Sequence, residues 1–427
     1  RPSSPNAPSL ERPSRASVRR PVPNTPSAIL KLVEALEFAA ARQLVIDTVR
    51  AARPAPIVHT VELRSALSRV LASDVLADRA YPPVDRSIRD GFAVRAADLP
   101  GTLRVVGEVR AGASFEGEIE NGECLRIMTG APVPRGADAI VMVEHTRIEG
   151  TSMTTDRAPS PGEFINRAGC EAAMGDVVLR AGTRIGYRQI AMLATAGVVE
   201  VDVVRHPSVA ILATGDEVVD VEDVPREFEV RNSNSWALAA QVAEAGGAYR
   251  MLPVAPDDLE QTRSCIEEAL NADLLLLSGG VSAGEYDYVE AALAQLGAEF
   301  FFTRVKIRPG APLVFGRAQG KFFFGLPGNP LSTAVTYAVF ARAAQELLGG
   351  IEEPTLTMTE ARITTTLREK PGLTRFLPAR LEDGRVTPIF WKGSSDVPSL
   401  ANSNCYIVAT TERELYTEGE HVPVLLA

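Results

Sequence analysis

The sequence predicts a multidomain α/β protein, in which a central, doubly wound α/β domain lies between β-rich N-terminal subdomains and a small C-terminal β domain. A chain of 427 residues is too long for one ordinary core. Between His206 and Gly350, short apolar runs alternate with helical segments, which is typical of a parallel sheet. On both sides of that region, short alternating segments are separated by Gly and Pro, which favours β-rich domains.

Composition limits the possible functions. Hydrophobic residues make up 45% of the chain and charged residues 23%, as expected of a soluble globular protein. The formal net charge of −10 argues against a nucleic-acid partner, so we expect a small-molecule partner. No apolar run reaches the roughly 18 residues that a membrane span requires. The four cysteines are far apart and form no CxxC pair, which favours a reduced, cytoplasmic location without a zinc or disulfide framework.

The first 27 residues are rich in Pro, Ser and Arg and predict a disordered tail. A basic targeting segment is the alternative, but no apolar stretch follows its arginines. Because residue 1 is not methionine, we expect the natural chain to begin earlier. Apolar spacing then predicts helices over Ala28–Ala52, Thr60–Leu71 and Gly186–Ala196.

The α/β region is predicted element by element. SVAILAT is a continuous apolar run, as expected of a strand that is buried on both faces. We expect helices at about 233–246, 257–270, 286–297 and 331–348, strands at 249–254 and 273–278, and a hairpin over 312–326. Three turns, Thr214–Glu217, Ser278–Asp287 and Gly325–Ser332, follow strands. They are therefore expected at the carboxyl edge of the sheet, where ligands of such folds bind.

Carboxylates gather after these strands, as Asp216 with Glu217, Asp257 with Asp258, and Glu285 with Asp287. Converging carboxylates repel one another unless a cation or a proton lies between them, and Mg²⁺ suits such oxygen ligands. For any single acid a simpler explanation is as good, such as a helix cap at Asp257 or a solvated Glu217. The three groups together favour a metal site.

Two Gly-rich turns, SGGVSAGEYDY and GLPGNPLS, offer backbone amides to an anion, although neither is a Walker sequence. Either turn alone is equally well explained as a plain tight turn. Between these two turns, the segment around KIRPGAP brings Arg304, Lys306 and Arg308 towards the same edge, where arginine side chains are suited to bind phosphate. A solvated basic strand is the alternative.

Two further turns lie outside the α/β region, PPVDRSIRDGFAVR and IMTGAPVPRGADAIVM. Together with LATGDEV, SGGVSAGEYD, RPGAP and GLPGNPLS, they occur in the same order as in the molybdopterin molybdenumtransferases, the family of bacterial MoeA and the gephyrin E domain. The chain resembles that family from about residue 30 to 427. Several long motifs in register are far more specific than any one of them.

The resemblance implies four subdomains after the tail of residues 1–27: 28–80 with 152–205, then 81–151, a molybdopterin-binding α/β domain at 206–350, and a C-terminal β-barrel at 351–427. It also implies a homodimer with a shared active site, and other proteins of molybdenum cofactor biosynthesis as candidate partners. The expected reaction inserts molybdate into adenylylated molybdopterin and releases AMP, with Mg²⁺ present.

The same resemblance assigns roles to individual residues. Asp90 and Thr129 of one subunit are expected to act in catalysis together with Glu217, Asp257 and Asp287 of the other, and the last three are also the expected metal ligands. The residues expected to bind substrate are Thr214, Gly215, Ser278, Gly279, Gly280, Ser282, Arg304, Arg308, Pro309, Pro327, Gly328, Asn329, Pro330, Ser332 and Ser394.

The chain departs from the family pattern mainly in its cations. The usual KPGKP is RPGAP here, so that Arg308 and Ala311 replace two lysines, and an expected arginine is replaced by Pro378. Lys306, Arg375 and Arg380 are candidate substitutes. Two smaller departures are Cys170, in an otherwise acidic motif, and Arg89, in place of a common Met.

Molybdenum insertion is therefore the main functional hypothesis. A degenerate paralogue, which binds molybdopterin or a protein partner as a scaffold without inserting metal, is the alternative that the lost cations suggest. A nucleotide-processing enzyme on the same fold is a third hypothesis, but it leaves the PPVD and TGAP turns without a role.

Overall fold

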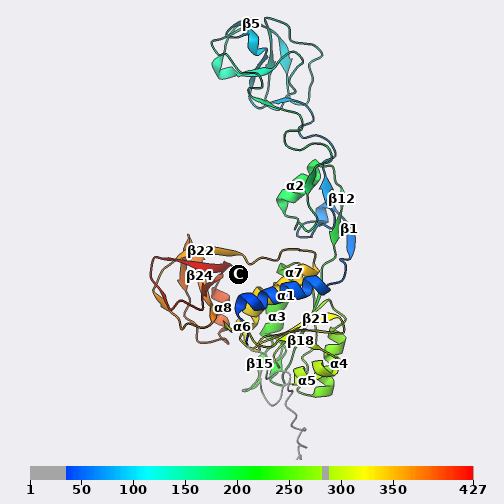
Figure 1. Ribbon diagram of the computed structural model, residues 1–427, viewed down its shortest axis with the longest axis vertical. Coiled ribbons are helices and arrows are strands. Elements are labelled where there is room, and N and C mark those ends of the chain that lie inside the picture. The colour runs from blue at the N-terminus through cyan, green and yellow to red at the C-terminus, as the bar shows by residue number, and fades with distance from the viewer. Residues whose placement is uncertain (1–34, 281–287, 427) are drawn as a thin grey trace, which may run out of the picture.

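The computed structural model describes residues 35–280 and 288–426 of the chain. The molecule is elongated (Figure 1). A β-rich domain lies at one end, a small intermediate domain follows, and the α/β and C-terminal domains lie side by side at the other end. No helix within the described ranges is long and apolar enough to cross a membrane.

The distal domain is built on a six-stranded sheet, as the punctuation by Gly and Pro predicts. Its strands are β4 (Gly91–Val94), β5 (Gly101–Val109), β6 (Glu123–Ile127), β7 (Ala139–Met142), β8 (Arg147–Glu149) and β9 (Ser152–Thr155), in the order β7-β4-β6-β5-β9-β8. Alternate residues of β4 belong to two different apolar clusters. Phe92 and Val94 lie in one cluster, and Ala93 lies in the other. The sheet therefore has a core on each face. A short pair, β3 (Arg86–Ser87) and β10 (Ile165–Asn166), lies beside it.

The intermediate domain contains the helix expected near Gly186, observed as α2 (Tyr187–Thr195). The expected helix over Thr60–Leu71 is wrong. Val58–Glu62 forms strand β1, which pairs antiparallel with β12 (Glu200–Val204), and only Leu63–Ser65 turns as a short 3₁₀ helix. β-branched residues favour a strand once a distant partner is available, and local periodicity cannot reveal that partner. The remaining pair is β2 (Val75–Leu76) with β11 (Val177–Leu179).

The α/β domain has a six-stranded sheet in the order β16-β13-β17-β21-β20-β18. The first four of these strands run parallel to one another, and β20 runs antiparallel to both of its neighbours. The elements are β13 (Ser208–Ala213), β14 (Val218–Val219), β15 (Val230–Arg231), α3 (Ser233–Glu244), β16 (Ala248–Met251), α4 (Leu259–Ala269), β17 (Leu274–Ser278), α5 (Tyr288–Gln295), β18 (Glu299–Phe302), β20 (Val314–Ala318) and β21 (Lys321–Leu326). The strand and helix alternation is thus as predicted.

The helix expected at 331–348 is continuous but irregular. It runs as α6 (Pro330–Thr336), a π-helical turn (Tyr337–Ala341) and α7 (Arg342–Leu348). The helix expected at Ala28–Ala52 begins later than predicted within the described residues. Leu36 forms a bridge to Val305, and α1 spans Phe38–Ala52. α1 lies against α7 on the α/β domain (Figure 1), although it precedes the β-rich domains in the chain.

Both faces of the sheet are covered. Val209, Ile211, Leu274 and Leu276 point into one core with α1, α3 and the 330–348 helix, while the residues between them, such as Ala210 and Leu275, face α4 and α5. Because β13 and β17 are buried on both sides, their sequences are apolar almost throughout rather than alternating.

The C-terminal domain is a closed β-barrel, since β24 pairs with both β25 and β26. Its elements are β22 (Met358–Ile363), β23 (Leu367–Arg368), β24 (Thr374–Glu382), β25 (Arg385–Pro388), α8 (Val397–Asn402), β26 (Cys405–Ala409), β27 (Leu415–Tyr416) and β28 (His421–Leu426). A short strand from the α/β region, β19 (Ile307–Arg308), extends this sheet by pairing with β24. The two domains therefore share main-chain hydrogen bonds.

Two glycines at the carboxyl edge of the α/β sheet differ in their surroundings. Gly280 has φ +64°, and a Cβ there would lie 2.6 Å from Val289 Cγ2 and 2.7 Å from Thr214 Oγ1. A Cβ on Gly328 would lie 3.6 Å from Gly279 Cα, an ordinary contact. Only the first position requires glycine.

We predict that Gly280→Ala destabilises the α/β domain by roughly 1–3 kcal/mol, because alanine is strained at positive φ and has no room there. The matched control Gly328→Ala is expected to change stability by about 0.5 kcal/mol or less. Urea unfolding followed by tryptophan fluorescence measures both variants. Equal destabilisation by the two substitutions contradicts the expectation.

Candidate functional site

Main-chain hydrogen bonds bring the three predicted turns together at one edge of the α/β sheet. The Thr214 N–H donates to Ser278 O at 3.1 Å, and the Gly279 N–H donates to Leu326 O at 3.3 Å. On the other side, the Gly215 N–H donates to Ala255 O at 3.2 Å. The ends of β13, β17 and β21 are therefore level, as expected of adjacent parallel strands.

Asn234 is a residue of this edge that the sequence analysis missed. Its Nδ2 donates to Ser278 Oγ at 2.9 Å and to Gly328 O at 2.8 Å, and so ties two of the turns together. Asn232, two residues earlier, caps α3 by accepting from the Ser235 N–H at 3.1 Å. The sequence Asn-Ser-Asn contains two asparagines, but the helix needs only the first as its cap. The second, Asn234, was the signal that could have indicated another role.

The acids after β13 and β16 are neighbours. Asp216 Oδ1 accepts a hydrogen bond from the Asp257 N–H at 3.0 Å, so Asp216 fixes the main chain at the next turn. Glu217 folds over Gly215, where an added Cβ would meet Glu217 Oε2 at 2.5 Å. Asp258, not Asp257, caps α4 by accepting from the Gln261 N–H at 2.9 Å. Glu217 and Asp257 are both exposed.

Two predicted residues, Ser282 and Asp287, lie outside the described residues. Within 35–280 and 288–426, no group of three His, Cys, Asp or Glu side chains is arranged to hold a metal ion. The described part of the edge therefore offers two carboxylates, from Glu217 and Asp257. Mg²⁺ typically takes one or two protein carboxylates and completes its shell with water and substrate phosphate, so the donor chemistry fits that ion.

The GLPGNPLS turn meets the C-terminal domain. α6 begins at Pro330, directly after Asn329, and the Leu331 N–H donates to Ser394 O at 3.0 Å. Thr333 Oγ1 donates to Pro327 O at 2.5 Å, which closes the turn from within. Ser332 is buried in the same helix. The turn is thus built by the α/β domain and closed over by a loop of the barrel.

Only some of the predicted basic residues are free to face the turns at this edge. Arg308 is exposed and lies 5.7 Å over the Trp391 ring, and the buried Pro309 follows it. Arg304 is exposed as well, whereas Lys306 forms a 2.8 Å ion pair with Glu37. The segment they share belongs to the barrel sheet through β19.

The candidate substitutes for the lost cations have other partners. Arg375 is 5% exposed, donates to Lys370 O, and forms a 3.2 Å ion pair with Glu369. Arg380 is paired with Glu382 at 2.6 Å. Pro378 lies in β24 opposite Tyr406. Each of the two arginines is therefore paired with a neighbouring glutamate.

The two predicted residues of the distal domain are in direct contact. Asp90 Oδ1 accepts from the Thr129 N–H at 2.6 Å and from Thr129 Oγ1 at 2.7 Å. The backbone hydrogen bond, followed by the hydroxyl, lowers the pKa of Asp90 below its usual range. Asp90 is thus held as an exposed carboxylate with a fixed orientation.

The rest of the PPVD turn is held by its own contacts. Asp85 accepts from the Ala168 N–H at 2.8 Å and from Arg167, and the backbone bond lowers the pKa of Asp85. Arg89 lies 5.8 Å over the Phe164 ring, and Cys170 Sγ donates to Asn166 Oδ1 at 2.7 Å. Arg89 and Cys170, the two smaller departures from the family pattern, therefore each contact a nearby side chain.

The two groups of residues lie at opposite ends of the chain in space (Figure 1). Asp90 and Thr129 belong to the distal β-rich domain, whereas Glu217 and Asp257 belong to the α/β domain at the other end. A single copy of the chain does not bring them together.

Three family models match successive parts of the chain. They are described as the MoeA N-terminal region (domain I and II) at residues 34–197, a probable molybdopterin binding domain at 210–346, and the MoeA C-terminal region (domain IV) at 360–427. Together they cover the distal, intermediate, α/β and barrel domains.

Relatives match over nearly the whole chain. The molybdopterin molybdenumtransferase of Bacillus subtilis is 37% identical over 382 residues, which cover 86% of this chain and 89% of the relative. The protein of the same name from Staphylococcus aureus is 34% identical over 380 residues, 86% and 90% of the two chains. The crystal structure of the molybdopterin biosynthesis moeA protein from Pyrococcus horikoshii superposes with a TM-score of 0.78 at 28% identity, over 92% of this chain and 100% of that one. The chain belongs to the molybdopterin molybdenumtransferase family.

Proposed function

We propose that this protein inserts molybdate into adenylylated molybdopterin and releases AMP, as a transferase of molybdenum cofactor biosynthesis. The observation that carries the proposal is the carboxyl edge of the α/β sheet, where Asp216 holds the turn of Asp257 beside Glu217. This pair lies next to turns suited to phosphate, in a chain that matches all three regions of the family. The alternative of a scaffold without activity is favoured by no finding.

Each group at the edge then has a defined task. Glu217 and Asp257 are the residues that would hold Mg²⁺ beside the pyrophosphate link of the substrate. When bound there, the ion would neutralise the negative charge that develops during displacement at phosphorus. The turns at Ser278–Gly280 and Pro327–Pro330 orient the phosphate groups through their backbone amides. Asp90, kept ionised by Thr129, orients the attacking oxygen of water or molybdate.

We propose further that the active site is shared between two copies of the chain in a homodimer. This follows from the separation of Asp90 and Thr129 from the α/β edge along the elongated molecule (Figure 1). In a symmetric dimer the distal domain of one copy meets the α/β domain of the other, and two equivalent sites result.

We also propose a cytoplasmic location. The four cysteines are all unpaired, which fits that location.

The first prediction concerns turnover. With adenylylated molybdopterin, Mg²⁺ and molybdate, the protein is expected to release AMP, which chromatography quantifies. Glu217→Gln and Asp257→Asn are each expected to lower kcat by roughly 100-fold, because each removes a carboxylate that would hold Mg²⁺ beside the reacting phosphate. Asp258→Asn is the matched control, since that side chain caps α4. AMP at background level with the unaltered protein contradicts the proposal.

The second prediction concerns pH. Thr129→Val removes the hydroxyl donor to Asp90, so the pKa of Asp90 rises and the carboxylate is protonated at a higher pH than before. The acid limb of the kcat/KM profile is therefore expected to move to higher pH. Thr154→Val, which removes an exposed hydroxyl in the same domain, is the control and leaves the limb in place. An unmoved acid limb in Thr129→Val shows that Asp90 is not the group that titrates.

The third prediction concerns the lost cations. Ala311 is half-buried in the loop that follows Arg308. Ala311→Lys is expected to lower the KM for molybdate by about tenfold or more, because a charge-assisted hydrogen bond contributes roughly 1.5–3 kcal/mol. Ala311→Gln supplies length without charge and serves as the control. If the lysine changes nothing, molybdate is bound by other residues of this chain.

A further inference from the structure

The segment that leads into α1 is attached to the strand that carries the basic residues. The Leu36 N–H donates to Arg304 O at 3.2 Å, and the Lys306 N–H donates to Leu36 O at 2.8 Å. The ion pair between Glu37 and Lys306 lies beside this short parallel bridge. Residues 36–37 therefore fix the main chain immediately before Arg308.

The first turn of α1 is placed between two domains. The Phe38 ring lies edge-on to Phe340 of the α/β domain, with centroids 5.6 Å apart, and edge-on to Phe376 of the barrel, at 5.2 Å. Such pairs add to the burial energy and fix the relative orientation of the elements that carry them. Further along the helix, Ala41, Val45 and Val49 are fully buried in the same core.

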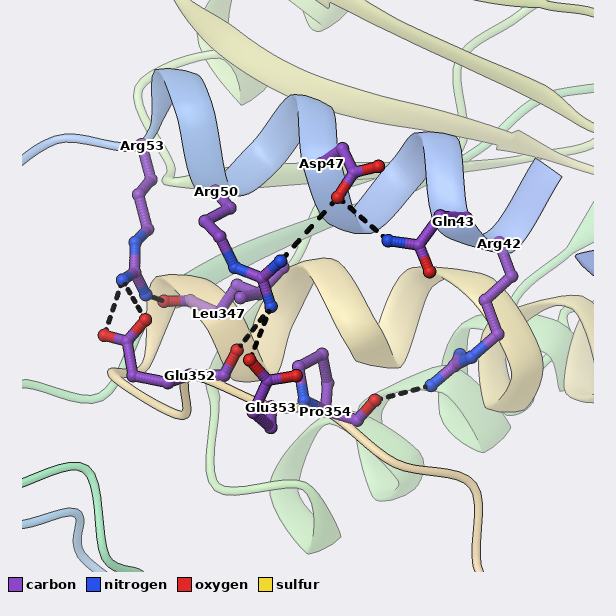
Figure 2. Close-up of polar contacts among 9 residues, drawn as sticks. All are labelled: Arg42, Gln43, Asp47, Arg50, Arg53, Leu347, Glu352, Glu353 and Pro354. Atoms are coloured by element: carbon purple, nitrogen blue, oxygen red, sulfur yellow. Dashed lines mark hydrogen bonds and ion pairs between the residues drawn. The ribbon is translucent and has the colours of Figure 1, made fainter. Parts of the chain in front are cut away.

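Two arginines of α1, and Arg53 directly after it, bind the 330–348 helix and its connection to the barrel (Figure 2). Arg53 donates to Leu347 O at 2.6 Å and pairs with Glu352 at 2.6 Å. Arg50 donates to Glu352 O at 2.8 Å and to Glu353 at 3.2 Å. Arg42 donates to Val339 O at 2.6 Å and to Pro354 O at 3.0 Å.

Two of the main-chain acceptors, Leu347 O and Val339 O, belong to the 330–348 helix, and two, Glu352 O and Pro354 O, belong to the connection. The arginines therefore fix the main chain of the connection to that helix. The connection, residues 349–357, contains no helix or strand of its own. A planar guanidinium with several donors suits this role, because it bonds two acceptors at once in a fixed geometry. Figure 2 shows Arg42 and Arg50 on one face of α1, with Arg53 directly after the helix.

We infer that α1 is a clamp that positions the C-terminal barrel on the α/β domain, with Arg42, Arg50 and Arg53 as positioning residues. Its effect on the reaction rests on the proposed function. The barrel contributes Ser394 and Trp391, and the α/β domain contributes the turn at Leu331 and the segment of Arg308. The clamp therefore sets the spacing between these barrel residues and the segments of the α/β domain at which the oxyanion is proposed to bind.

Hydrogen exchange tests the clamp independently of activity. Two amides report on the contact between the domains: the Leu331 N–H, which donates to Ser394 O, and the Thr374 N–H, which donates to Lys306 O. In the triple variant Arg42→Ala, Arg50→Ala, Arg53→Ala, both amides and the hydrogen-bonded amides of residues 349–351 are expected to exchange at least about tenfold faster. Glu352→Ala removes one side-chain acceptor and is expected to give a smaller increase. Gln43→Ala is the matched control, because that side chain bonds only within α1, to Asp47.

Faster exchange confined to α1 and the connection, with Leu331 and Thr374 unchanged, overturns the inference. If the clamp acts as inferred, the KM for molybdate in the triple variant rises roughly tenfold or more, since misplacement away from the chemistry has effects of that size. The kcat at saturating molybdate is expected to change less, whereas general destabilisation lowers both activity parameters with the folded fraction. If the unaltered protein releases no AMP, the proposed function fails while the exchange data still decide on the clamp.

Discussion

The hydrogen bonds between parallel strands at their carboxyl ends are the constraint on which the candidate site depends. Because β13, β17 and β21 are adjacent and in register, the turns after them begin at the same level. The bonds from Thr214 to Ser278 and from Gly279 to Leu326 fix this level at the exit of each strand. Asn234 and Asp216 then tie the turns to one another with side chains. The turns that carry Glu217 and Asp257 are therefore neighbours at this edge.

The proposed site includes residues from two other parts of the fold. The barrel reaches it through β19 and through Ser394, and α1 holds the barrel in place. The distal domain carries Asp90, already ionised and oriented by Thr129, but at the far end of the same chain. In the proposed homodimer, the distal domain of each copy lies at the α/β edge of its partner.

Sequence reasoning was accurate where a residue's environment is determined locally. The apolar runs of β13 and β17 predicted strands buried on both faces, and the helices between them are present. It failed at Thr60–Leu71, where the pairing of β1 with β12 depends on residues about 140 positions away. The contact between Asp90 and Thr129, the role of Asn234 and the ion pair of Lys306 with Glu37 depend likewise on tertiary structure. The resemblance to a family supplied the roles of Asp90 and Thr129, which turn composition alone does not indicate.

The most direct test of the account is subunit complementation. Asp90→Asn disables the distal half of the site, and Glu217→Gln disables the α/β half. When the two variant proteins are mixed and allowed to exchange subunits, half of the dimers are mixed and each of these has one intact site. AMP release is then expected to recover to about a quarter of that of the unaltered protein. A mixture that stays as inactive as either variant alone contradicts a site shared between two copies of the chain.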